Sequence, residues 1–322
     1  MAQDIAVIGA GSWGTAIATV LAELHEKVIL WARRDDLAQE INEQHENSAY
    51  LPGVRLSEKI VCETSIEKGV RNKKYIFLVV PSHAMRETVQ QIAPYLREDA
   101  ILIHATKGIE IGSLKRMTEV IKEEIPLGLR NRVAVISGPS HAEEVAIQSP
   151  TTVVVASENI KIAEEVQDII NTNFFRVYAN PDVIGVEIGG ALKNIIALGA
   201  GLSDGLNFGD NAKAALLTRG LAEISRFGIV LGGNPLTFSG LSGLGDLVVT
   251  AAIAAIGGQE ICWPRDCLWK KSCKKWAWLW KGYVPPGEPI NYPCNMALRC
   301  LLPGKFMLFY LKIRRQKMRF VI

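Results

Sequence analysis

Residues 5–15 read IAVIGAGSWGT and decide the fold of the first part of the chain. The apolar run Ile5–Ile8 predicts a buried strand, and residues 15–24 predict a helix. The turn between them consists of Gly9, Ala10, Gly11, Ser12, Trp13 and Gly14. Glycines let a backbone turn sharply and approach a pyrophosphate, while a helix start offers free N–H groups to the anion. The stretch therefore predicts a dinucleotide-binding turn, with a purely structural turn as the alternative.

Further apolar strands are predicted at regular intervals, with helical periodicity between most of them. They lie at residues 27–31, 75–80, 100–104, 132–136, 151–156 and 174–178, and a helix at residues 160–170 separates the last two. This alternation is typical of an α/β fold with a Rossmann-type, doubly wound, mainly parallel sheet. From residue 183 onward Gly/Ala-rich helical stretches replace the β pattern. We predict an NAD(P)-binding domain at residues 1–182 and an all-α substrate domain at 183–322.

The bulk composition suits a globular protein of two domains, with 322 residues of which 48% are hydrophobic. No apolar run is expected to reach the length of a membrane span, and the first strand begins too early for a signal peptide. We therefore expect a cytoplasmic protein. The histidines and cysteines show no ligand spacing, which predicts that no metal is bound.

The last part of the chain differs sharply in composition from the rest. Residues 1–260 carry 23 Lys and Arg against 31 Asp and Glu, whereas residues 261–322 carry 13 against 2. Five of the seven Trp and five of the six Cys also follow residue 260. A basic tail with tryptophans could contact nucleic acid or a membrane surface. We expect neither partner, because a shifted reading frame explains the tail better.

Basic side chains follow two of the predicted strands, at the edge where an open α/β sheet binds its ligands. Arg33 and Arg34 stand where NAD-selective proteins usually carry an acid for the ribose hydroxyls, so a 2′-phosphate and hence NADPH are favoured. Lys107 follows the strand at 100–104. It either meets a phosphate or carbonyl group or is a solvated loop lysine.

The strand at 132–136 leads into Ser137-Gly138-Pro139-Ser140. Ser140 and Glu143 have capping-box spacing, which predicts a helix start that can also bind a substrate anion. His141 is expected in the first turn of that helix, with a structural role.

A single lysine, Lys193, interrupts the apolar, small-residue helix predicted over residues 185–198. Burial would lower its pKa and make it a proton donor or acceptor near neutral pH. The alternative is a lysine whose stem packs while its ammonium reaches water. Asp246 lies in another glycine-rich apolar stretch, as a helix cap or as an acceptor for a substrate hydroxyl.

Six segments resemble bacterial NAD(P)-dependent sn-glycerol-3-phosphate dehydrogenases in order and spacing, over residues 4–250. They read GAGSWGTA, VPSHAMR, ATKGIE, SGPSHAEEVA, GVEIGGALKNIIALGAG and GLSGLGDLVVT. The resemblance implies reversible hydride transfer between NADP(H) or NAD(H) and dihydroxyacetone phosphate, which yields sn-glycerol 3-phosphate for phospholipid synthesis. It leaves a homodimer open.

The same resemblance assigns roles to individual residues. Lys193 resembles the general acid and base, and Lys107 resembles a lysine shared by substrate and cofactor. The other residues that resemble substrate contacts are Gly138, Ser140 and Asp246. Besides the glycines of the turn, those that resemble cofactor contacts are Ser12, Trp13, Arg33, Arg34, Tyr50 and Ala142.

The resemblance stops after residue 250, where the family continues with S-R-N and R-R-A-G segments that this chain lacks. The missing arginine grips the substrate phosphate and the cofactor in the family. A codon register shifted by one base lets residues 252–260 encode YSRNRRAG, residues 278–287 encode AVEGIRTAR, and residues 303–310 encode REVYAV. We infer a frameshift between Thr250 and Ile253, so residues 253–322 are not expected to be native-like.

Two other classes of protein remain as alternatives. Neighbouring dehydrogenases of 6-phosphogluconate, 3-hydroxyisobutyrate or 3-hydroxyacyl-CoA also join such a sheet to a helical domain. The last needs a catalytic His–Glu pair, and neither His104 nor His141 stands in that family's setting. The second alternative is a remnant that binds the cofactor without catalysis.

Overall fold

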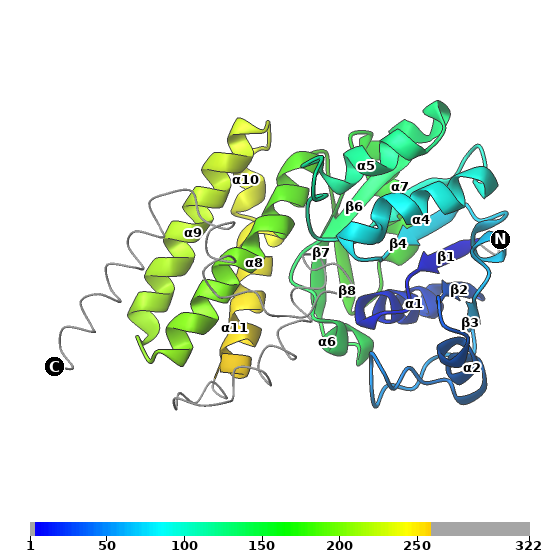
Figure 1. Ribbon diagram of the computed structural model, residues 1–322, viewed down its shortest axis with the longest axis horizontal. Helices are drawn as coiled ribbons and strands as arrows, with labels where there is room; N and C mark the ends of the chain where they lie inside the picture. The colour runs from blue at the N-terminus through cyan, green and yellow to red at the C-terminus, as the bar shows by residue number, and fades with distance from the viewer. Residues whose placement is uncertain (1–3, 259–322) are drawn as a thin grey trace. The chain divides into compact units, whose positions relative to one another are not determined.

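The computed structural model describes residues 4–258 and begins with an eight-stranded sheet (Figure 1). The strands are β1 (Ile5–Ile8), β2 (Val28–Trp31), β3 (Ile60–Glu63), β4 (Tyr75–Leu78), β5 (Ile101–His104), β6 (Val133–Ser137), β7 (Thr151–Ala156) and β8 (Phe175–Asn180). The helices between them are α1 (Ser12–Leu24), α2 (Asp35–Gln44), α3 (Ile66–Val70), α4 (Met85–Ile92), α5 (Met117–Glu124), α6 (Ala142–Ala146) and α7 (Ile160–Ile170). The segments at 278–287 and 303–310, which encode family motifs in the shifted register, lie outside the described residues.

The strand order is β3-β2-β1-β4-β5-β6-β7-β8, and every neighbouring pair is parallel except β6 and β7. Ile5 of β1 stands between Val28 of β2 and Tyr75 of β4. The chain therefore builds outward in one direction from β1 and in the other from β4. Open α/β sheets bind their ligands beyond the carboxyl ends of the strands at such a switch point. The glycine turn follows β1 at this place.

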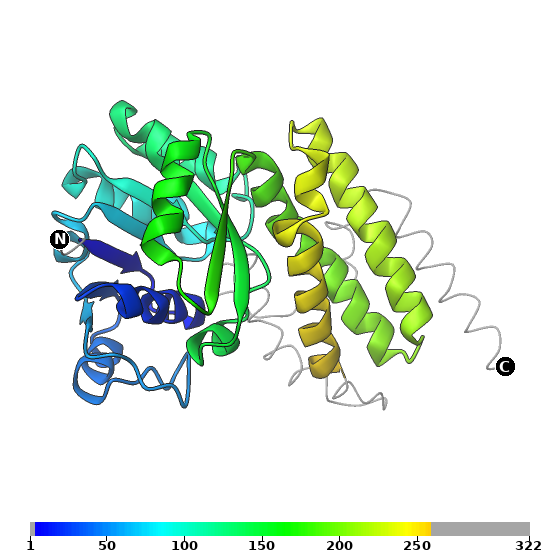
Figure 2. The same ribbon diagram turned by 180° about the vertical axis from the view of Figure 1, so that it is seen from behind.

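Helices lie on both faces of the sheet, as the two opposite views show (Figures 1 and 2). Ile5 and Val7 of β1 pack in a core with α1 and α7, whereas Ala6 and Ile8 pack in a second core with α4 and α5. Alternate side chains of a strand point to opposite faces. A strand that meets helices on both sides must be apolar at every position, which explains the continuous apolar runs.

Only helices follow β8 within the described residues. They are α8 (Val183–Gly205), α9 (Asp210–Val230), α10 (Pro235–Phe238), the π-helix Leu241–Gly245 and α11 (Asp246–Gly258). The long helix α8 packs against both α9 and α11. Ile188 and Ile196 of α8 share a core with Ile224 of α9 and Leu247 of α11. The sheet and the helices match the predicted fold class.

The expectation that no segment is long and apolar enough to cross a membrane was wrong. Two described segments meet that test by length and composition, Val183–Gly205 and Pro235–Ile253. Their most apolar windows are 67% and 44% buried inside the protein. Core helices of folded proteins pass the same test, and α8 holds two buried charged residues, Glu187 and Lys193. Burial against the protein explains the apolar character of α8 without a membrane.

The sequence predicted seven of the eight strands to within two residues at each end. It missed β3, a four-residue edge strand in which only Ile60 and Cys62 are buried, so the apolar signal is short. The start of α8 at Val183 lies next to the predicted domain boundary. That boundary itself stays a prediction.

Candidate active site

The glycines of the turn after β1 meet different surroundings. Gly9 has φ of +119°, and a Cβ there would lie 2.4 Å from the Val79 carbonyl oxygen. A Cβ on Gly14 would lie 1.8 Å from the Gly9 carbonyl oxygen. A Cβ on Gly11, by contrast, would meet no protein atom within 4 Å. Gly9 and Gly14 are thus required by the packing of the turn itself, whereas Gly11 faces open space that a ligand can fill.

The start of α1 fits the phosphates of a dinucleotide. Gly11 is the N-cap and supplies no side chain to the helix, and the first backbone N–H that bonds back into the turn is that of Thr15, 2.9 Å from the Gly11 oxygen. The N–H groups of Ser12, Trp13 and Gly14 precede it and have no acceptor within the helix. Free N–H groups and the positive end of the helix dipole attract an anion.

Hydrogen bonds join a short segment between α2 and β3 to the glycine turn. Asn47, which is fully buried, donates from Nδ2 to the Ala10 carbonyl oxygen at 3.1 Å and to Thr15 Oγ1 at 2.8 Å. The Ser12 hydroxyl donates to the Tyr50 carbonyl oxygen at 2.6 Å. The predicted cofactor contacts Ser12 and Tyr50 are therefore held together by the protein. Trp13 is half-buried against the core, with its ring 6.4 Å from that of Phe175.

The two arginines after β2 differ in their partners. Arg34 donates from Nε to Asp36 at 2.9 Å and forms an ion pair with the same carboxylate, and the Tyr50 side chain also acts on it electrostatically. The Asp36 contact raises the pKa of Arg34 and lowers that of Asp36 to about 2. Arg33 is exposed and makes no ion pair with any residue of the described part. Of the two arginines, Arg33 is thus the one whose guanidinium can bind a phosphate without first breaking an ion pair.

The predicted catalytic residue, Lys193, meets two of the predicted substrate contacts, Lys107 and Asp246. Lys107 donates from Nζ to Asp246 Oδ2 at 2.7 Å, and Lys193 pairs with Asp246 Oδ1. The side chains of Lys193 and Asp246 are only 5% and 2% exposed, whereas that of Lys107 is 24% exposed. The alternative for Lys193 requires its ammonium group to reach water, and this burial rules it out. Lys193 and Lys107 instead share the carboxylate of Asp246.

A hydroxyl group completes the surroundings of Lys193. Thr250 Oγ1 accepts a hydrogen bond from Lys193 Nζ at 2.6 Å and donates to the Asp246 carbonyl oxygen at 2.7 Å. Asp246 and Thr250 are one turn apart on α11, and Asp246 directly follows the π-helix 241–245. Single π-turns inside α-helices are frequent at functional sites.

The Lys193 ammonium has an unusually low pKa. Burial lowers the pKa of Lys193 from 10.5 to about 7, because the charged form loses its hydration. Asp246 raises this pKa and Lys107 lowers it, so the two neighbours oppose each other. A group with this pKa is close to half protonated at neutral pH, which suits a general acid and base.

The loop after β6 differs from the prediction. The Ser140 hydroxyl donates to the Gly138 carbonyl oxygen at 3.0 Å, and α6 begins at Ala142 with His141 as its N-cap. The capping box of Ser140 and Glu143 was therefore wrong, because the Ser140 hydroxyl bonds locally and the helix starts later. His141 lies just before the first turn, 3.1 Å from Glu143. Ala142 is buried at the start of α6.

The same loop nevertheless borders the two lysines. Lys107 Nζ lies 3.5 Å from the Gly138 carbonyl oxygen. Pro139 packs against Gly245, the residue before Asp246. Gly138, Ser140, Lys107, Lys193 and Asp246 thus line one region, as the predicted substrate contacts require.

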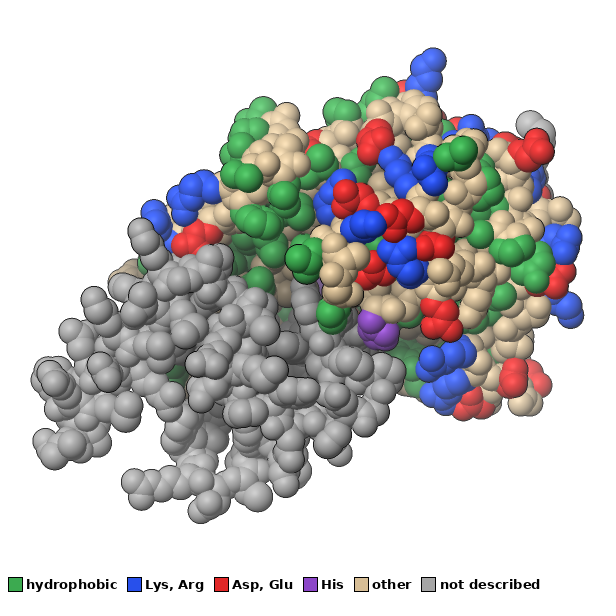
Figure 3. Space-filling view, turned by 45° about the horizontal axis from the view of Figure 1, so that its top comes forward, with side chains coloured by type: hydrophobic (Ala, Val, Ile, Leu, Met, Phe, Trp, Pro, Cys, Tyr) green, Lys and Arg blue, Asp and Glu red, His purple; other side chains and the backbone are tan. Residues whose placement is uncertain are grey.

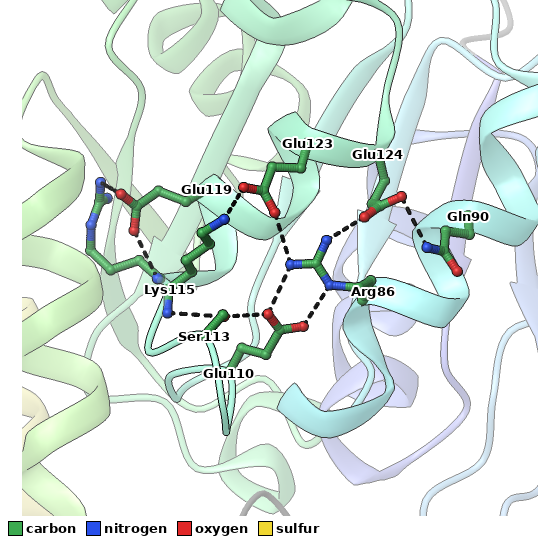
Figure 4. A network of polar contacts seen from close by, with 9 residues as sticks. Arg86, Gln90, Glu110, Ser113, Lys115, Glu119, Glu123 and Glu124 are labelled. Carbon is green, nitrogen blue, oxygen red and sulfur yellow. Dashed lines mark hydrogen bonds and ion pairs between the residues drawn. The ribbon is translucent and has the colours of Figure 1, made fainter.

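A network of ion pairs fixes the segment that carries Lys107 (Figure 4). Arg86 of α4 binds Glu110 through two hydrogen bonds of 2.8 Å each and also pairs with Glu123 and Glu124 of α5. The Arg86 hydrogen bonds lower the pKa of Glu110 to about 2. Figure 3 shows a face on which acidic and basic side chains alternate. Bidentate arginine contacts are directional, so the network holds the loop after Lys107 in place.

A histidine and a glutamate that the sequence did not connect form a buried pair. His104, at the end of β5, places Nε2 3.1 Å from Glu187 Oε1 of α8. The two residues were not expected to meet. Their side chains are 0% and 3% exposed, so the pair is closed off from solvent. Among the described residues no three His, Cys, Asp or Glu side chains gather as a metal ion would need.

Comparison with known protein families identifies both parts of the chain. Residues 4–163 match the model of the NAD-dependent glycerol-3-phosphate dehydrogenase N-terminus, and residues 182–255 match that of the C-terminus. The chain belongs to the glycerol-3-phosphate dehydrogenase family.

Individual relatives agree with this assignment. The chain is 55% identical over 248 residues to glycerol-3-phosphate dehydrogenase [NAD(P)+] of Bacillus velezensis, which covers 77% of this chain and 72% of that relative. The Bacillus subtilis enzyme of the same name is 54% identical over 248 residues, with the same coverage of 77% and 72%. A crystal structure of glycerol-3-phosphate dehydrogenase from Coxiella burnetii superposes with a TM-score of 0.78 at 37% identity, covering 87% of this chain and 86% of that one.

Three buried polar residues in or near the site were not singled out from the sequence. Thr250 and Asn47 are common polar residues whose partners are distant along the chain, 57 residues away for Thr250 and 32 for Asn47. Glu187 lies in a motif that was quoted, and an acid in an apolar helix is the same signal that singled out Lys193. The family match ends near residue 255, close to the change in composition.

Proposed function

We propose that this site serves the NAD(P)H-dependent reduction of dihydroxyacetone phosphate to sn-glycerol 3-phosphate and the reverse reaction, which the chain catalyses once its reading frame is restored after residue 252. One observation carries the proposal. Lys193 is buried, has a pKa near neutrality, and shares Asp246 with Lys107, which follows β5 at the same edge of the sheet at which the glycine turn follows β1. The names of the relatives, glycerol-3-phosphate dehydrogenase [NAD(P)+], support the substrate and the cofactor.

The residues present fit a nicotinamide dinucleotide. The N–H groups at the start of α1 would hold the pyrophosphate, with Gly11 leaving the space for it. Arg33, with Arg34, would bind the 2′-phosphate of NADPH, while Ser12, Trp13, Tyr50 and Ala142 would line the cofactor. When bound, the nicotinamide supplies the hydride that reduces the carbonyl carbon.

The chain itself supplies the proton. Lys193 in its ammonium form donates a proton from Nζ to the carbonyl oxygen as negative charge develops there, and Asp246 and Thr250 hold Nζ in place. Lys107 places a second positive charge beside the same oxygen or the phosphate. In the reverse direction the neutral Lys193 amine accepts the hydroxyl proton. Asp246, Gly138 and Ser140 would hold the remaining substrate groups.

We also propose that the reading frame shifts between Thr250 and Ile253, in the gene or in its reading. The family match ends at residue 255, and the alignment with the Bacillus velezensis enzyme leaves more than a quarter of that relative uncovered. The frame-restored chain is the protein read in the shifted register after residue 252. A cytoplasmic location and a homodimer complete the proposal, and light scattering of purified protein checks the dimer.

Replacement of Lys193 by methionine tests the proposed role in the frame-restored chain. Methionine keeps an apolar stem and removes the proton donor, so the rate of NADPH oxidation with dihydroxyacetone phosphate should fall about 10²–10⁴-fold. NADPH affinity, measured by fluorescence titration, should stay near that of the parent. A variant with a normal rate would make Lys193 a packing residue and pass the role to Lys107 first.

A further inference from the structure

Glu187 is a buried carboxylate that bonds to several partners and lies outside the group formed by Lys107, Lys193 and Asp246. Its Oε1 accepts the backbone N–H of Thr118 at 2.7 Å and lies 3.1 Å from His104 Nε2, while its Oε2 accepts Arg116 Nη1 at 2.5 Å. His104 Nε2 also lies 3.1 Å from Thr118 Oγ1. Although burial opposes ionisation, the hydrogen bond and charge of His104 and the charge of Arg116 keep the pKa of Glu187 below its usual value.

The partners of Glu187 all belong to the sheet part and bracket the segment that carries Lys107. His104 ends β5 three residues before Lys107, and Arg116 and Thr118 stand at the start of α5. Glu187 itself lies on α8, six residues before Lys193. One carboxylate therefore joins both ends of the Lys107 segment to the helix that carries the other lysine.

The backbone of α8 also lies close to Lys107. A Cβ on Gly190 would stand 3.8 Å from Lys107 Cγ and 2.9 Å from Ser137 Oγ. Apolar packing alone would permit α8 to slide or rotate slightly against the sheet, because dispersion contacts have little directional preference. A carboxylate with fixed donors on three groups is directional and sets one orientation of the helix.

We propose that Glu187 is a positioning residue that fixes where Lys193 lies relative to Lys107, so that both ammonium groups reach the two oxygens of Asp246. This role rests on the proposed function, in which the two lysines act on one substrate. Glu187 touches neither the cofactor site nor Asp246 in the structure, and it acts through the orientation of α8.

The proposal is tested in the full chain with Glu187→Gln, which keeps the shape and removes the charge. The reactivity of each lysine toward acetic anhydride is measured against pH, with peptides read by mass spectrometry. We expect the pH at which Lys193 reaches half of its full reactivity, its midpoint, to rise toward that of an ordinary lysine. The reason is that α8 no longer holds Nζ buried and close to Lys107. The matched control is Glu119→Gln, which removes an exposed carboxylate 3.3 Å from Arg116 that does not lie on α8. The Lys193 midpoint of this control should equal that of the parent.

A purely stabilising role gives a different result. Glu187→Gln would then lower the unfolding temperature while the Lys193 midpoint stayed that of the parent, and this outcome would overturn the proposal. If Glu187→Gln does not fold, Arg116→Gln removes one donor only and should shift the Lys193 midpoint in the same direction by less. An unchanged midpoint in that variant would also overturn it. The labelling needs no turnover, so failure to reduce dihydroxyacetone phosphate would count against the proposed function alone.

Discussion

The protonation state of Lys193 links a single buried side chain to the direction of the reaction. Its pKa near 7 means that the ammonium form declines as the pH rises through neutrality. Reduction needs the protonated amine and should slow above about pH 7, whereas oxidation needs the neutral amine and should speed up over the same range. Rates of the frame-restored chain in both directions, measured at saturating substrate against pH, check this. A reduction rate that stays constant well above neutrality would contradict it.

The choice between cofactors also depends on single residues. Arg34 is already paired with Asp36, whereas Arg33 has no ion-pair partner in the described part. We therefore expect Arg33→Ala to weaken NADPH binding more than Arg34→Ala does. The loss in Arg33→Ala should be about 1.5–3 kcal/mol, the contribution of one charge-assisted hydrogen bond. Fluorescence titration with NADPH and NADH measures both variants, and NADH affinity is the internal control. If the ratio of the dissociation constants for NADPH and NADH is the same in the parent and both variants, the arginines do not bind the 2′-phosphate.

At the scale of an element, the glycine turn separates a packing role from a binding role. Gly11→Ala puts its methyl group into open space, so the unfolding temperature should stay near that of the parent while NADPH binding weakens. Gly14→Ala puts its methyl group 1.8 Å from the Gly9 oxygen, so both stability and binding should fall. Thermal unfolding and NADPH titration of the two variants distinguish the roles. Unchanged NADPH affinity in Gly11→Ala would place the pyrophosphate elsewhere.

Elements with strong local signals could be predicted from the sequence, and contacts between distant elements could not. Strands such as β1 and β4 are apolar at every position because helices cover both faces, and this pattern is visible in the chain. The edge strand β3 buries alternate residues over only four positions and gives a weak signal. The Ser140 capping box failed because the Ser140 hydroxyl donates to the Gly138 carbonyl oxygen and α6 begins only at Ala142.

The candidate site shows the same division. Lys193 was found because a charged residue in an apolar helix is unusual. Lys107 was found because it follows a strand at the edge where such sheets bind their ligands, and family motifs surround both lysines. That Asp246 joins them, and that Glu187 meets His104 83 residues away, depends on how α8 and α11 pack. Such contacts are set by the tertiary structure and leave no local pattern in the sequence.

For the molecule as a whole, the helical part exposes many apolar side chains. Val230, Leu236 and Val248 are 83%, 79% and 49% exposed. Exposed apolar patches mark surfaces that another segment or protein covers, or that aggregate. The family sequence that the shifted register encodes after residue 252 would supply further chain and the missing arginine. We therefore expect the frame-restored chain to be more soluble than the chain as written.

The most direct test is the rate of NADPH oxidation with dihydroxyacetone phosphate, measured for the frame-restored chain and the chain as written under identical conditions. The account predicts turnover by the restored chain, and NADPH binding with little or no turnover by the chain as written, because remote binding energy at the phosphate helps to hold the reacting carbonyl in place. No turnover by the restored chain would contradict the proposed function, and full turnover by the unrestored chain would contradict the frameshift.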